Sequence, residues 1–68
     1  MKPALKNKLF MSSVLRLTQA WDDGMIRGQT YAESVATLAM YMRKQIISKG
    51  VVDSYVQRII QEDKAWLL

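Results

Sequence analysis

Apolar residues recur every three or four positions along most of the chain, which is the spacing of one face of an α-helix. The clearest case is the stretch 30–50, where six apolar residues fall on one stripe at roughly 100° per residue. They are Tyr31, Val35, Leu38, Ala39, Met42 and Ile46. The pattern predicts a helix that buries this stripe.

Both ends of that helix carry signals. Thr30 and Glu33 have the spacing of a capping box, in which each side chain accepts from the other residue's backbone amide. Arg43 and Lys44 favour a helix C-terminus. Gly50 is a glycine, the residue that most easily adopts the left-handed conformation that ends many helices. We therefore predict that the helix begins at Thr30 and ends at Gly50.

A second apolar stripe lies opposite the first and contains Ala36, Met40 and Ile47. A face exposed to solvent is normally polar, so this stripe needs an explanation. Either the helix is central in a small bundle, or the stripe is an interface with a second copy or another protein.

A preceding helix is predicted over 3–21, because Pro3 suits a first turn and a helical stripe follows it. Ala4, Met11 and Leu15 form a weaker stripe on its other side. The main stripe consists of Leu9, Phe10, Val14, Leu17, Ala20 and Trp21.

The segment after Trp21 is predicted to be a short connection. Asp22, Asp23 and Gly24 favour a turn, Met25 and Ile26 are expected to fold inward, and Gly28 is expected to act as a second helix breaker. A connection this short makes the two helices antiparallel neighbours.

A third helix is predicted over 54–66, with Asp53 as its N-cap. Asp63 interrupts its apolar face, and two explanations are open. Either the last turn frays or rotates outward, or Asp63 pairs with an arginine, because burying an unpaired carboxylate is costly. The apolar face consists of Tyr55, Val56, Ile59, Ile60, Trp66 and Leu67.

These elements predict an all-α fold with a single domain over 1–68. We expect a small three-helix bundle in which the first two helices form an antiparallel hairpin and the third helix packs across them. A chain of 68 residues buries a limited core. It has neither Cys nor His, so disulfides and the usual zinc sites are excluded. Oligomerisation or partner binding remains as a source of added stability.

Catalysis is not expected. There is no His or Cys to act near neutral pH, and Ser12 and Ser13 have no evident activating base. Gly24 and Gly28 are not followed by the Lys of a phosphate-binding loop. We expect no catalytic residue, no cofactor and no metal site.

Charge permits a different partner. The net charge of +4 is an ordinary solubility charge, but the predicted hairpin gathers cations at one end and Asp22, Asp23, Glu33, Glu62 and Asp63 at the other. A small transcriptional regulator that binds nucleic acid is therefore the alternative function. Its candidate contacts are Lys6, Lys8, Arg43, Lys44, Lys49 and Arg58.

Membranes are a weaker alternative. No stretch reaches the roughly 20 apolar residues of a membrane span, and Ser12 and Ser13 interrupt any secretory signal core. The basic first helix resembles a membrane-surface helix, but the bundle core needs its apolar face. The lack of cysteine fits a cytoplasmic protein.

The leading expectation is a non-enzymatic adaptor or inhibitor that binds a protein, either another chain or a second copy of itself. Four apolar residues outside the main stripes are its candidate contacts, and methionine suits adaptable contacts. They are Met11, Leu15, Met40 and Ile47. In the competing interpretation the third helix covers this surface and the chain is a monomer. In size and basicity the chain is similar to small regulatory proteins of phages and plasmids that modulate a host protein.

Overall fold

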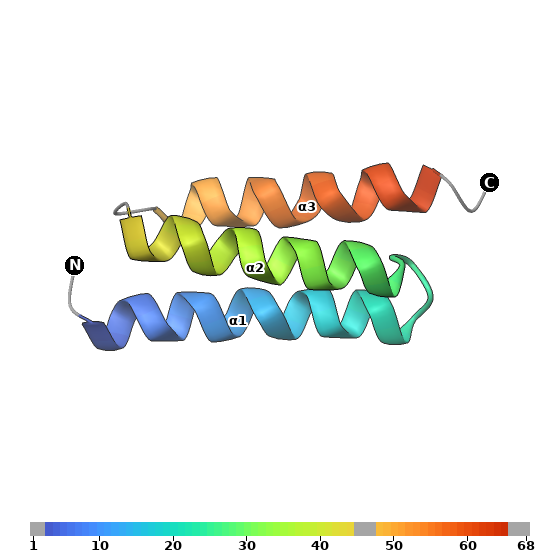
Figure 1. Ribbon diagram of the computed structural model, residues 1–68. Coiled ribbons are helices and arrows are strands. Elements are labelled where there is room, and N and C mark those ends of the chain that lie inside the picture. Colours follow the sequence, from blue (N-terminus) through green and yellow to red (C-terminus); the bar gives the residue numbers. More distant parts are fainter. Residues whose placement is uncertain (1–2, 45–47, 66–68) are drawn as a thin grey trace.

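A computed structural model describes the backbone of residues 3–44 and 48–65 and the side chains of 7–44 and 48–64. It contains three helices: α1, Pro3–Asp22; α2, Gly28–Lys44; and α3, Lys49–Ala65. The helices lie side by side and alternate in direction, with α3 packed against both members of the α1–α2 hairpin (Figure 1). The predicted all-α three-helix bundle is confirmed.

The core lies along the axis where the three helices meet. The predicted stripes supply most of it, and Ile26, only 4% exposed, closes one end of the bundle from the α1–α2 connection as expected. Small polar side chains also enter the core: Ser13 is 2% exposed and donates a hydrogen bond to the Leu9 carbonyl at 2.8 Å. The buried apolar residues are Leu17, Ala20, Ile26, Leu38, Met42, Val52 and Val56.

The turn after α1 needs a glycine. Gly24 has φ of 74°, which L-residues with a side chain adopt at a cost. Its amide donates to the Trp21 carbonyl at 3.0 Å, and the Met25 amide donates to the Ala20 carbonyl at 2.8 Å. This is the Schellman arrangement, which satisfies the last carbonyls of the helix.

The predicted start of α2 at Thr30 is wrong. The helix begins at Gly28, and the Tyr31 amide donates to the Arg27 carbonyl at 2.9 Å, so Arg27 is the N-cap residue. Gly28 is therefore helical rather than a breaker. A Cβ at Gly28 would lie 3.6 Å from the Trp21 indole, an ordinary van der Waals contact, so the position does not require glycine.

The predicted boundary between α2 and α3 is also wrong. Ser48, not Asp53, caps α3, because its hydroxyl accepts from the Val51 amide at 3.3 Å. Gly50 lies inside α3 and does not end α2. The early start is favoured because it carries Val52 into the core, where it is 1% exposed. The predicted helical residues 45–47 lie outside the described residues.

Candidate protein-binding groove

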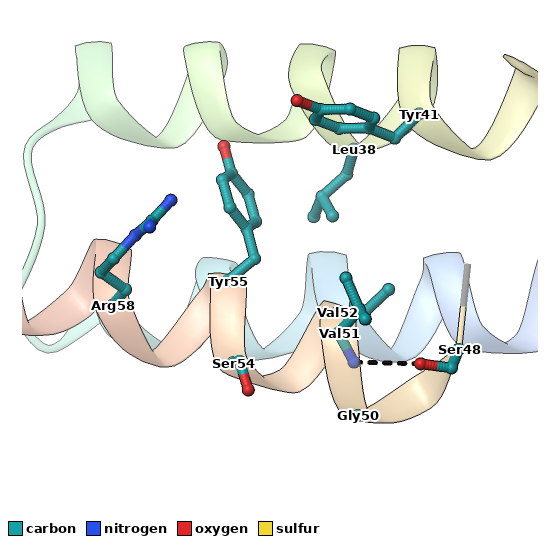
Figure 2. A pocket seen from close by; sticks show the side chains of 9 residues that line it. All are labelled: Leu38, Tyr41, Ser48, Gly50, Val51, Val52, Ser54, Tyr55 and Arg58. Atoms are coloured by element: carbon teal, nitrogen blue, oxygen red, sulfur yellow. Dashed lines mark hydrogen bonds between the residues drawn. The ribbon is translucent and has the colours of Figure 1, made fainter. Parts of the chain in front are cut away.

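An open groove of about 810 Å³ runs between α2 and α3. Leu38 of α2 and Val52 of α3 form its floor, and both are almost fully buried. Its walls are mainly apolar and consist of Tyr41, Val51 and Tyr55. Figure 2 shows Tyr41 and Leu38 entering from α2, with Tyr55 and Arg58 reaching toward them from α3. The groove therefore presents apolar surface with one cation at its edge.

Two of the wall residues expose large apolar side chains: Tyr41 is 46% exposed and Val51 is 60% exposed. The early start of α3 places Val51 there, because the Ser48 cap makes residue 51 part of the first helical turn. Sequence reasoning missed this wall. It placed Val51 between the two predicted helices and left Tyr41 off both stripes of α2.

None of the described residues predicted to bind protein lines the groove. Met40 is 50% exposed and adjoins Tyr41 on the outer surface of α2. Met11 and Leu15, 64% and 58% exposed, lie on α1, which does not line the groove. Ile47 lies outside the described residues. The groove is therefore a different surface from the predicted one.

The cations predicted to bind nucleic acid gather mainly at one end. The start of α1, the end of α2 and the start of α3 meet there (Figure 1), and Lys8, Arg43 and Lys44 are all exposed. Lys49 is exposed too, but its ammonium lies 2.7 Å from the Asp53 carboxylate. Arg58 lies farther along α3 at the groove, and the side chain of Lys6 lies outside the described part.

Asp53 joins α3 to α1. Its carboxylate accepts from Lys49 at 2.7 Å and from Arg16 of α1 at 3.0 Å. The hydrogen bond from Lys49, with the charges of Lys49 and Arg16, holds the pKa of Asp53 below its usual value. The residue predicted to cap α3 thus links α3 to α1 through a partly exposed ion pair.

The opposite end carries the acidic residues. Asp22, Asp23, Glu33 and Glu62 are exposed, whereas Asp63 is only 6% exposed. Asp63 pairs with Arg27, which confirms the arginine explanation for an acidic residue on the apolar face of α3.

No family model, curated protein or solved structure matches the chain. Among the described residues, no group of three or more acidic, His or Cys side chains is placed to hold a metal ion. No helix in the same part of the chain combines the length and apolarity needed to cross a membrane.

Proposed function

We propose that this protein is a non-enzymatic adaptor or regulator that binds a protein chain through the groove between α2 and α3. The observation that carries the proposal is the exposed apolar wall formed by Tyr41 and Val51 over a buried floor. Water disfavours such a surface, and a partner that covers it gains the free energy of apolar burial.

The side-chain types in the groove suit a protein partner. Tyrosine and arginine are enriched among the residues that contribute most to protein interfaces, and the groove holds Tyr41, Tyr55 and Arg58. Arg58 is exposed and makes no ion pair with any described residue, so its guanidinium is available to a carboxylate.

A binding role, rather than catalysis, also agrees with the chemistry of the chain, which has neither His nor Cys. The absence of cysteine suits the reducing environment of a cytoplasm, where we propose that the protein acts.

Affinity capture with three forms of the full chain tests the proposal. Val51→Lys places a charge in the groove, and Met11→Lys makes the same kind of change at an exposed position on α1. Both variants should retain the helical circular dichroism of the wild type. We expect proteins captured by the wild type at high salt to be kept by Met11→Lys and lost by Val51→Lys. Equal capture by both variants would exclude the groove as the binding site.

A second candidate function is binding of nucleic acid. The exposed, unpaired positions of Lys8, Arg43 and Lys44 at one end of the described bundle favour it. Affinity for a labelled duplex would fall steeply with salt, because phosphate contacts release counterions. Arg43→Ala with Lys44→Ala should weaken such binding about equally for different sequences, whereas Val51→Lys should spare it.

A further inference from the structure

We propose that the partner in the groove is a second copy of this chain, packed antiparallel about a two-fold axis that crosses the groove beside Leu38. This inference rests on the proposed function, since it names the occupant of the same groove. The order of charges along α2, and the position of their midpoint beside the groove floor, support it.

One row of α2 follows the groove on its outer side. It contains Glu33, Thr37, Met40 and Lys44, spaced by four, three and four residues, so they share one side of the helix over three turns. Glu33 and Lys44 are exposed at opposite ends of this row, and Met40 lies between them. The surface is acidic at one end, apolar in the middle and basic at the other.

The two charges lie symmetrically about the groove. Leu38 follows Glu33 by five positions and Ala39 precedes Lys44 by five, so the midpoint falls beside the groove floor.

Leu38 lies opposite Val52 across the groove, and Tyr55 enters the groove farther along α3 (Figure 2). The midpoint of the two charges on α2 therefore places the axis.

With a two-fold axis at this level, the surface of α2 is complementary to the same surface of the second copy. The axis brings Glu33 of each copy to Lys44 of the other, so a single contact is made twice. A parallel pairing would instead set Glu33 against Glu33 and Lys44 against Lys44, which like-charge repulsion disfavours.

The size of this face is sufficient for a dimer. The molecule measures 40 × 17 × 16 Å, so one long face offers roughly 700 Å², and two copies that met over all of it would bury about 1,400 Å². That is within the range of specific protein interfaces. A chain this short gains added stability from such burial.

Sedimentation equilibrium of the full chain, with charge reversals, tests the inference. We expect a wild-type dimer, and we expect Glu33→Lys and Lys44→Glu each to weaken it by about tenfold or more, because each reversal converts two attractive contacts into repulsive ones. An equimolar mixture of the two variants should recover affinity to within about threefold of the wild type, because each variant then meets the opposite charge.

Arg43→Glu is the matched control. It changes the net charge as Lys44→Glu does, but Arg43 lies on the side of α2 that adjoins Phe10 of α1. We expect it to leave the dimer unchanged. Equal weakening by Arg43→Glu and Lys44→Glu, or no recovery in the mixture, would overturn the antiparallel pairing.

A wild-type chain that stays monomeric to millimolar concentration would overturn the second copy as occupant. The groove would then remain a site for a different protein, which the capture comparison of Val51→Lys and Met11→Lys tests separately.

Discussion

The carboxylate of Asp63 accepts a hydrogen bond from the backbone amide of Arg27 at 2.7 Å and another from the Arg27 guanidinium at 2.8 Å. Arg27 is the N-cap residue of α2, so its amide has no partner within the helix. A side chain from the last part of α3 therefore supplies the negative charge that the start of α2 favours. One contact joins the α1–α2 connection to the third helix.

Loss of the Asp63 carboxylate should destabilise the fold. Asp63→Asn keeps the shape of the side chain but removes the charge that holds Arg27, and we expect the Tm to fall by roughly 5–15 °C. Asp23→Asn is the control, because Asp23 is exposed and its side chain makes no hydrogen bond or ion pair with the described residues. Thermal circular dichroism measures both. Equal Tm values for the two variants would contradict a stabilising role for Asp63.

Acid should lower the stability of the fold through the same contact between Arg27 and Asp63. Hydrogen bonds from the Arg27 side chain, followed by that from its amide, lower the pKa of Asp63 below its usual value. The folded state thus binds this proton less tightly than the unfolded state, and the stabilisation is complete above the unfolded pKa. It is lost as the pH falls through the folded-state pKa. Urea unfolding between pH 7 and pH 2 should show less stability below about pH 4 and a weaker pH dependence in Asp63→Asn.

Two glycines should respond to alanine in opposite directions. Gly24→Ala should lower the free energy of unfolding by about 1 kcal/mol, because the positive φ of Gly24 disfavours a Cβ. Gly50→Ala should raise it by about 0.5 kcal/mol, because Gly50 is helical and its nearest neighbour to an added Cβ lies 4.0 Å away. Urea unfolding measures both changes. A loss at Gly50 would indicate that α3 begins later than the structure shows.

Truncation of two valines of α3 should change the free energy of unfolding by different amounts, because one lies in the core and the other at the groove. Val56 is fully buried, so Val56→Ala should cost about 2 kcal/mol through lost burial and a residual cavity. Val51 is 60% exposed, so Val51→Ala should change monomer stability by no more than about 0.5 kcal/mol. Denaturant unfolding at low micromolar concentration compares them. A large effect at Val51 alone would place that side chain in the core.

The cap of α3 is open to a similar test. Ser48→Ala removes the hydroxyl that accepts from the Val51 amide and should cost about 1 kcal/mol, whereas Ser48→Gly should cost less. Ser54→Ala is the matched control, because Ser54 lies inside α3 and is exposed. Equal stabilities of Ser48→Ala and Ser54→Ala would show that Ser48 is not the N-cap of α3.

Much of the fold could be predicted because helical periodicity and turn chemistry agree with each other. The stripe containing Leu17 and the stripe containing Leu38 both face the core, and Gly24 ends α1 as expected. The pairing of Asp63 with an arginine was one of two expectations, since a carboxylate on an apolar face needs a partner. Which arginine it would be depended on the packing of α3, which no local pattern contains.

The helix boundaries failed where two local signals competed. Thr30 and Glu33 match a capping box, but Asp63 stabilises an earlier start by holding the Arg27 amide. Gly50 resembles a helix stop, but the Ser48 hydroxyl and the burial of Val52 favour an α3 that contains Gly50. Tertiary contacts decided both cases.

The groove was missed for the same reason. The part of its wall at Val51 depends on the early start of α3.

The contact between Arg27 and Asp63 also bears on the order of folding. The α1–α2 hairpin joins near neighbours in sequence, but the N-terminus of α2 receives its carboxylate only from a residue 36 positions later. Until α3 docks, the first turn of α2 lacks this carboxylate and frays more readily. The hairpin and α3 therefore gain stability together, and the bundle should unfold as one cooperative unit rather than by release of its third helix.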